Sequence, residues 1–205
     1  MQPTDTYGME DSLLLWPSLN DRAFVETRAF RGAWVANRAE ERLFRMIKGF
    51  HEAGDVLVSE SKADPRRAQN LVYPAIFAYR QSLELRLKSL LLDFGHAAGE
   101  PPEFRTHDLK ALWAKFKRVV AFFENDLQSA DADAFCAAEA LVAEFDTVDP
   151  GSDAFRFAHD TKGRSVKLAL SQVDLANLRK VIANLHNFLE CVACHFHYKL
   201  DIATS

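Results

Sequence analysis

Apolar residues recur every three or four positions along the C-terminal part of the chain, and this period constrains the fold more than any other feature. From residue 171 to about residue 200 the spacing is that of an α-helix with one face buried in a core. That face consists of Leu178, Ile182, Leu185, Leu189, Val192 and Phe196. The segment Ser171 to Asp174 has the pattern of a helix-capping box, with Asp in place of the usual Glu. We therefore predict a long amphipathic helix as the last element of the chain.

Four further segments have helical periods, so the chain should fold as an all-α protein. The predicted helices cover residues 21–51, 67–94, 107–125 and 132–145. Gly54 and Asp55 should end the first of them, and Gly95 should stop the second. Pro74 should lie near the true start of the second helix or kink it. Together with the last helix, these segments predict an antiparallel bundle of four to five helices.

The second predicted helix has an apolar and a charged face. Leu83, Leu87 and Leu90 mark the face that we expect to be buried. On another face Arg80, Glu84 and Lys88 are spaced four residues apart. Glu84 before Lys88 is the favourable order for an ion pair on an exposed helix surface.

Residues 148–170 form a long segment without a helical period. It contains Pro150, Gly151 and Gly163, and residues 164–170 alternate enough to predict a short strand or hairpin arm. Long irregular segments inside compact domains are commonly functional or bind a partner. We expect the same of this loop.

Composition and the N-terminal sequence bear on the domain organisation and the compartment. With 205 residues, of which 48% are hydrophobic and 26% charged, the chain can form one core. We predict an irregular N-terminal arm, residues 1–20, and a single domain, residues 21–205. Three Cys do not form a disulfide framework, and the first apolar run, Leu13–Trp16, is too short for a signal peptide or membrane span. We therefore expect a cytoplasmic protein without membrane contact.

The charge is weakly acidic overall and unevenly distributed. A formal net charge of -4 disfavours a protein that coats nucleic acid through a general positive field. Basic residues predominate over 61–120 and acidic residues over 121–160. This asymmetry predicts either a dipolar surface or ordinary solvated helix faces.

A polar stripe runs along the border of the apolar face of the last helix. On an ideal helix Arg179, His186, Glu190 and His197 fall within about 20° of one line. Ala183 and Ala193 fill the gaps between them. Histidine can serve as a general base and arginine can hold a phosphate, so the stripe is a candidate catalytic surface; chance alignment on a solvated flank is the alternative.

Several fragments of the chain resemble the HEPN domains, helical bundles of prokaryotic toxins, defence ribonucleases and nucleotidyltransferase partners. The segment Leu83–Leu91 is similar to the second-helix pattern of the family, and Thr106-His-Asp-Leu109 to the opening of the next helix. Asp153-Ala-Phe-Arg-Phe157, before Asp160 and Gly163, resembles the loop that precedes the last helix. Arg179 and His186 match the spacing and position of the Arg–His ribonuclease motif.

The resemblance implies a HEPN-like bundle that pairs as a homodimer, with a composite site, and cleaves RNA without a metal. It implies that His186 transfers a proton, Arg179 holds the phosphate, Glu190 and His197 support them, and the product ends in a 2′,3′-cyclic phosphate. Arg156 and His159 would contact RNA from the long loop; pairing of Arg156 with a nearby acid is the alternative. His107 is interpreted as a helix-start residue whose ring bonds backbone groups.

One position departs from the pattern of the active family members. They usually carry Asn, Asp or His directly after the Arg, where this chain has Lys180. Non-catalytic members bind nucleotides or serve as dimerisation modules. The second hypothesis is therefore a non-catalytic module that binds a nucleotide, RNA or a partner protein such as an antitoxin.

The segment Cys191-Val-Ala-Cys194-His195 matches the c-type haem attachment string. It lies inside a continuous helical pattern, where Cys194 is turned about 60° away from the side that Cys191 and His195 share. We interpret these cysteines as buried thiols of a helix and expect neither a cofactor nor a metal.

Overall fold

The computed structural model describes residues 19, 22–24, 33–123, 129–168 and 170–203. Residues 1–35 and 36–205 form separate compact units. The predicted irregular arm, residues 1–20, lies outside the described residues except for Leu19. The described helices all belong to the second unit.

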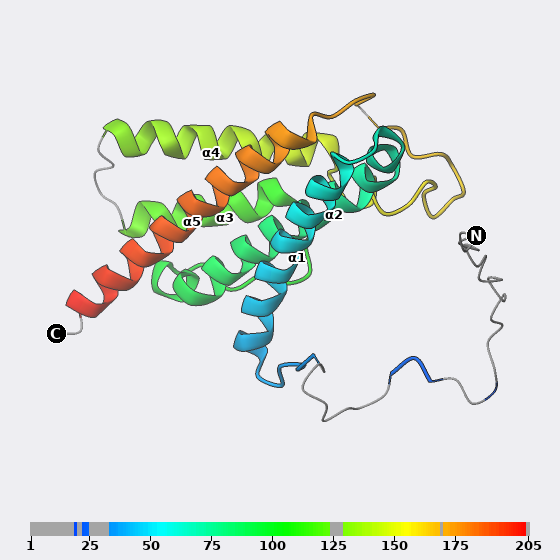
Figure 1. The fold of residues 1–205 in the computed structure, drawn as a ribbon. Helices are drawn as coiled ribbons and strands as arrows, with labels where there is room; N and C mark the ends of the chain where they lie inside the picture. The colour runs from blue at the N-terminus through cyan, green and yellow to red at the C-terminus, as the bar shows by residue number, and fades with distance from the viewer. Residues whose placement is uncertain (1–18, 20–21, 25–32, 124–128, 169, 204–205) are drawn as a thin grey trace, which may run out of the picture. The chain divides into compact units, whose positions relative to one another are not determined.

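The described part of the chain contains α-helices and no β-strand, which confirms the all-α prediction (Figure 1). The five α-helices of the described residues are α1 (Ala39–Ser61), α2 (Pro65–Phe94), α3 (Leu109–Phe123), α4 (Ser129–Val148) and α5 (Leu175–Ala203), and a 3-10 turn, η1 (Gly95–Ala98), follows α2. None of the described helices combines the length and the apolar character that a membrane span needs.

Helices α1 and α2 form a hairpin whose bounds differ from the prediction. Residues 33–37 are not helical, so α1 begins at Ala39 rather than at residue 21, and it continues through Gly54 and Asp55. A Cβ atom at Gly54 would lie 2.5 Å from Cε1 of Tyr79 on α2. Gly54 therefore does not end the helix; it lets the two helices approach closely.

Helix α2 begins where the sequence offers a cap. The side chain of Asp64 accepts a 2.8 Å hydrogen bond from the Arg66 amide, and Pro65 occupies the first helical position. The helix then passes through Pro74 without interruption. Gly95 caps α2 in a right-handed conformation. The residue with a left-handed backbone is Gly99, with φ 71°, which caps the 3-10 turn η1.

The last helix and the loop before it also differ in detail from the prediction. Asp174 itself caps α5 by accepting hydrogen bonds from the Ala176 and Asn177 amides, so the helix begins one residue after the predicted box. For residues 164–170 we predicted a short strand or a hairpin arm; the described residues of this loop form no strand, but an antiparallel bridge joins His159 and Ser165. Ala169 lies outside the described residues.

The main core lies where α2, α3, α4 and α5 meet. The predicted faces are confirmed: Leu83, Leu87 and Leu90 of α2 are buried, as are Leu185 and Leu189 of α5. A smaller cluster joins α1, α2 and α5 and comprises Val58, Ala75, Tyr79 and Ile182. It lies directly beside polar side chains of the same three helices.

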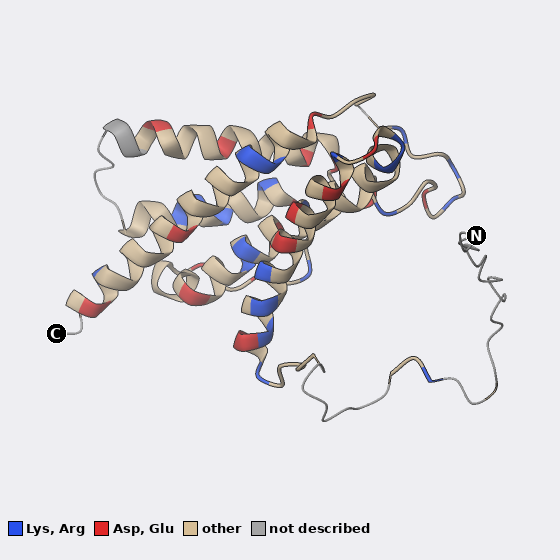
Figure 2. Cartoon of the chain, in the orientation of Figure 1, with Lys and Arg blue, Asp and Glu red and all other residues tan. Residues whose placement is uncertain are grey.

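Basic residues of α3 and acidic residues of α4 lie on two helices that pack against each other (Figure 2). Lys110 and Lys117 of the basic helix α3 bind Asp146 and Glu139 of the acidic helix α4, with N–O distances of 3.2 and 2.6 Å. The asymmetry of the sequence is therefore partly balanced by packing α3 against α4.

Candidate active site

The Arg179 guanidinium binds two groups on α1. Its Nε lies 3.1 Å from Oδ1 of Asp55, and its Nη1 donates a 3.0 Å hydrogen bond to Oγ of Ser59. Tyr79 of α2 donates a 2.7 Å hydrogen bond to the same Asp55 oxygen. One carboxylate therefore joins three helices, while the Arg179 side chain keeps 39% of its surface exposed.

The Tyr79 hydroxyl stays protonated in this arrangement. Burial raises the pKa of Tyr79 well above its ordinary value, and the hydrogen bond and charge of Asp55 raise it further, against the opposing effect of Arg179. The phenol is therefore a fixed donor that holds Asp55 in place for Arg179.

Two turns further along α5, His186 lies among groups from all three helices. Its ring stacks on that of His51 of α1, with centroids 4.8 Å apart and 29° between the planes. Its Nε2 lies 3.6 Å from Oε1 of Glu190, and the other carboxylate oxygen of Glu190 lies 2.8 Å from Nη2 of Arg86 on α2. Glu190 thus stands between a histidine and an arginine, as an orienting carboxylate would.

The surroundings of His186 favour its neutral form. Burial lowers the pKa of His186 below its ordinary value, and the nearby His51 and Arg86 lower it further, while Glu190 opposes them. A quarter of the side chain, 25%, is still exposed. At neutral pH His186 is therefore an unprotonated imidazole that solvent can reach, which is the state a general base requires.

A cavity of about 10 Å³ is lined by His51, Ser82, Arg86 and His186 together with apolar side chains of α2 and α5. Nδ1 of His51 and Nε of Arg86 are buried and have no hydrogen-bond partner among the described residues. The cavity has about the volume of one water molecule, although most of its lining is apolar. We call the whole set of residues the polar seam: His51, Asp55, Ser59, Tyr79, Arg86, Arg179, His186 and Glu190.

The structure brings some of the predicted site residues together and separates others. His186 and Glu190 are neighbours, whereas Arg179 lies about 10 Å away along the helix axis, seven residues earlier on α5. His197 packs its ring edge-on against Phe94, with centroids 4.7 Å apart. Its ring thus contacts the apolar core and not the polar seam.

The two predicted RNA-binding residues lie on the loop between α4 and α5. The Arg156 guanidinium lies 5.6 Å from the ring centroid of Phe77 and 4.9 Å from that of Phe157, and it donates a 3.4 Å hydrogen bond to the Ser152 carbonyl. Within the described ranges, aromatic rings rather than an acid are thus the neighbours of its charge. His159 is exposed and bridges to Ser165.

Sequence reasoning missed His51, Asp55 and Arg86. His51 and Asp55 are four residues apart and therefore share a face of α1, but a helix that ends at Gly54 hides that signal. Arg86 lies within the segment Leu83–Leu91, but the charged face that we predicted for this helix did not include it. A longer first helix would have placed one histidine and one aspartate on a common face.

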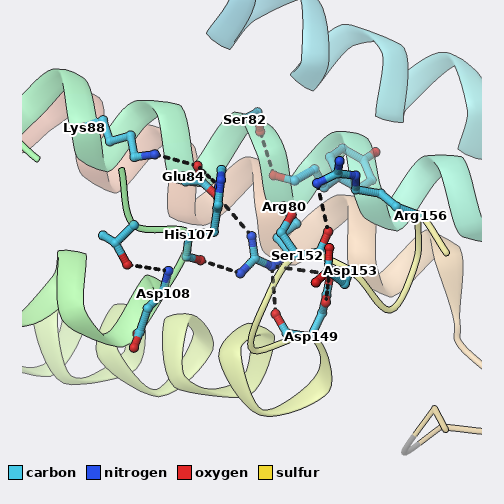
Figure 3. Close-up of polar contacts among 12 residues, drawn as sticks. Arg80, Ser82, Glu84, Lys88, His107, Asp108, Asp149, Ser152, Asp153 and Arg156 are labelled. Carbon is cyan, nitrogen blue, oxygen red and sulfur yellow. Dashed lines mark hydrogen bonds and ion pairs between the residues drawn. The ribbon is translucent and has the colours of Figure 1, made fainter. Parts of the chain in front are cut away.

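A second polar cluster lies on another side of α2 and is buried (Figure 3). Glu84, only 1% exposed, accepts hydrogen bonds from Arg80 at 3.1 Å and from Lys88 at 2.8 Å. Nδ1 of His107 lies 2.9 Å from the same carboxylate. The prediction of an exposed Glu84–Lys88 pair is therefore wrong, and the His107 ring binds a side chain rather than backbone groups.

This buried charge network fixes the two loops that precede α3 and α5. Arg80 donates to the carbonyls of His107, at 2.8 Å, and Asp149, at 3.0 Å. Lys88 donates to the carbonyl of Phe104, at 3.1 Å. Loop carbonyls thus complete the bonding of buried cations, which explains why α2 carries charges on a face that is not exposed.

The loop after α4 is shaped by Asp149. Its Oδ1 accepts 2.9 Å hydrogen bonds from the amides of Asp153 and Ala154, and its Oδ2 lies 3.5 Å from Nε of Arg80. Between these contacts Ser152 is fully buried with a positive φ of 62°. A non-glycine residue in this conformation is strained by about 1–3 kcal/mol, which the contacts of Asp149 offset.

Cys191 and Cys194 of α5 are exposed, so the prediction of buried thiols in this helix is wrong. Within the described ranges, no group of three or more His, Cys, Asp and Glu side chains is arranged to hold a metal ion. No family model, no curated protein and no solved structure matches the chain. The polar seam must therefore be interpreted from its own geometry.

Proposed function

We propose that this chain is a HEPN-like, metal-independent endoribonuclease of the toxin or phage-defence type, acting in the cytoplasm as a homodimer. The observation that carries the proposal is His186, a partly exposed imidazole with a lowered pKa beside the carboxylate of Glu190. Such an imidazole can accept a proton at neutral pH, and the carboxylate stabilises the charge that it gains.

The reaction that these groups support is an internal transesterification of RNA. His186 takes the proton of a ribose 2′-hydroxyl, and the 2′-oxygen attacks the adjacent phosphorus. The bond from phosphorus to the 5′-oxygen breaks, and that oxygen leaves with a proton from solvent. The products are a 2′,3′-cyclic phosphate and a 5′-hydroxyl.

Arg179 is the residue that we assign to the phosphate. An arginine binds phosphate oxygens in the same bidentate way as it binds a carboxylate, so an RNA phosphate competes with Asp55 for it. Because Arg179 lies about 10 Å along α5 from His186, it would hold a neighbouring phosphate or complete the site of a second protomer. In the proposal, Arg156 and His159 contribute RNA contacts from the loop.

The test is cleavage of a mixed RNA pool by the purified chain in EDTA. We expect fragments that end in 2′,3′-cyclic phosphate from the wild type and none from His186→Ala. His96→Ala, which removes an exposed histidine outside the polar seam, is the matched control and should cleave like the wild type. Equal cleavage by His186→Ala and the wild type would refute the proposal.

The alternative is a non-catalytic module that binds a nucleotide, RNA or a partner protein such as an antitoxin. The engagement of Arg179 by Asp55 and Ser59 favours it, because an arginine that holds helices together needs no catalytic role. Retention of RNA on a filter without any cleavage product, unchanged in His186→Ala, would identify the module.

A further inference from the structure

A cavity of about 410 Å³ lies between α4, the loop that follows it and the first turns of α5. This volume is within the range of about 300–1,000 Å³ that is typical of small-molecule sites. Its walls are mostly apolar and include Ile76, Leu141, Phe145, Phe155, Leu178 and Val181. The cavity is distinct from the polar seam, so a ligand can bind in it whether or not the chain cleaves RNA.

The charged groups that line the cavity are all acidic. They are Glu144, Asp149 and Asp174, and neither Lys nor Arg lines the cavity within the described part of the chain. Uncharged amides of Gln172 and Asn177 complete the polar lining. An apolar cavity with carboxylates and no cation is complementary to a ligand that is itself apolar and positively charged.

The three carboxylates are not equivalent. Asp149 is 1% exposed and lies next to Arg80, although its Oδ2 has no hydrogen-bond partner among the described residues (Figure 3). Asp174 is committed to capping α5. Glu144 is exposed, and its side chain makes no ion pair or hydrogen bond with the other described residues. Glu144 is therefore the carboxylate that a bound cation would meet.

The start of α5 does not turn this cavity into an anion site. The amides of Ala176 and Asn177 would attract an anion, but the carboxylate of Asp174 already accepts from both. A phosphate or carboxylate ligand would have to displace Asp174 and approach two further acids. The electrostatics thus exclude the ligand class that a bare helix N-terminus would favour.

We propose that this cavity binds a small organic amine with a flat apolar body. The ring system lies against Phe145 and Phe155, and the ammonium group pairs with Glu144 at the rim. Leu178 and Val181 of α5 form the opposite wall, on either side of Arg179 in the sequence. A bound ligand would therefore contact the same turns of α5 that carry Arg179.

The experiment compares three probes that share one ring and differ in charge: tryptamine, 3-ethylindole and indole-3-propionate. Their dissociation constants are measured on the full chain by titration of backbone amide NMR shifts. We expect tryptamine to bind about fivefold more tightly than 3-ethylindole, the value of one partly exposed ion pair. Indole-3-propionate should bind most weakly.

Two variants connect the binding to this cavity. Glu144→Gln should abolish the preference for tryptamine over 3-ethylindole and leave 3-ethylindole unaffected. Glu139→Gln, on the same helix but paired with Lys117, is the matched control and should preserve the preference. Val181→Phe should fill the cavity and weaken both probes, with thermal unfolding used to confirm that the variant is folded.

Each outcome decides the proposal. A preference for tryptamine that Glu144→Gln removes supports it. Equal binding of all three probes, tighter binding of indole-3-propionate, or binding that is unchanged in a folded Val181→Phe variant would overturn it.

Discussion

The imidazole rings of His51 and His186 stack with their centroids 4.8 Å apart, and they join the first and last helices of the bundle. Two histidines at this distance cannot both be protonated without mutual repulsion, and Arg86 adds a further positive charge nearby. Burial is the main cause that lowers the pKa of His186, and the repulsion from His51 adds to it, which makes His51 a positioning residue for the proposed base.

Replacing His51 by phenylalanine should raise the pKa of His186 toward its ordinary value. The aromatic ring can still stack, but the repulsion between the two imidazoles is lost, while burial and Arg86 continue to lower the pKa. The measurement is an NMR titration of the His186 ring protons in the wild type and in His51→Phe. The acidic limb of the RNA cleavage profile should move to higher pH by the same amount. An unchanged His186 pKa would show that His51 has only a packing role.

The stability of the fold should also depend on pH through His186. Its pKa is lowered from an unfolded value of 6.5, so between the two pKa values the unfolded chain binds more protons than the folded one. The free energy of unfolding contributed by the neutral ring is present above the unfolded pKa and is lost as the pH falls through the folded pKa. Urea unfolding at about pH 7.5 and about pH 5 should show a smaller loss in His186→Gln than in the wild type. Equal losses would mean that other groups account for the acid sensitivity.

The helices could be predicted from the sequence because their apolar faces repeat with a helical period. Leu83, Leu87 and Leu90 of α2 and Ile182, Leu185 and Leu189 of α5 are buried as that period requires. The end of the first helix was predicted wrongly because we interpreted Gly54 as a helix breaker, the usual role of a glycine at the end of a helical pattern. In the structure Gly54 leaves room for the Tyr79 ring of α2. Tyr79 is distant in the sequence, so no residue near Gly54 indicates this contact.

The sequence also could not decide whether the charged side chains of α2 are exposed or buried. Arg80, Glu84 and Lys88 have the spacing of an exposed surface network, and nothing local distinguishes that from a buried one. Arg80 and Lys88 can be buried because loop carbonyls, those of Phe104, His107 and Asp149, accept their hydrogen bonds. Similarly, the stripe on α5 predicted which residues share a face, but the partners on α1 and α2 depend on how the helices pack.

Glu84→Gln should destabilise the fold strongly. The substitution keeps the shape of the side chain but removes the negative charge between Arg80 and Lys88, which are 0% and 4% exposed. Breaking a buried ion pair by removing one partner costs about 3–5 kcal/mol. Urea denaturation gives the value. Glu41→Gln, which breaks an exposed pair with Arg45, is the control and should cost at most about 0.5 kcal/mol. Similar losses in the two variants would mean that the network contributes no more than a surface pair.

Gly54→Ala and Gly49→Ala should change stability in opposite directions, although both sites are glycines of α1. At Gly49 no atom lies within 4 Å of the position of a new Cβ, so alanine should stabilise the helix by about 0.5–1 kcal/mol. At Gly54 the new Cβ would lie 2.5 Å from the ring of Tyr79, and Tyr79 is completely buried. Tyr79 can move only by separating α1 from α2, so overpacking should outweigh the helical preference and cost about 1–3 kcal/mol.

The same displacement reaches the polar seam, because the Tyr79 hydroxyl holds Asp55, and Asp55 holds Arg179. We therefore expect Gly54→Ala to weaken RNA cleavage as well as stability, and Gly49→Ala to leave cleavage unchanged. Thermal unfolding and the cleavage assay on the two variants together provide the measurement. If Gly54→Ala proved as stable as Gly49→Ala, the close contact between α1 and Tyr79 would not exist in solution. The arrangement of Asp55 and Arg179 that depends on this contact would then be wrong as well.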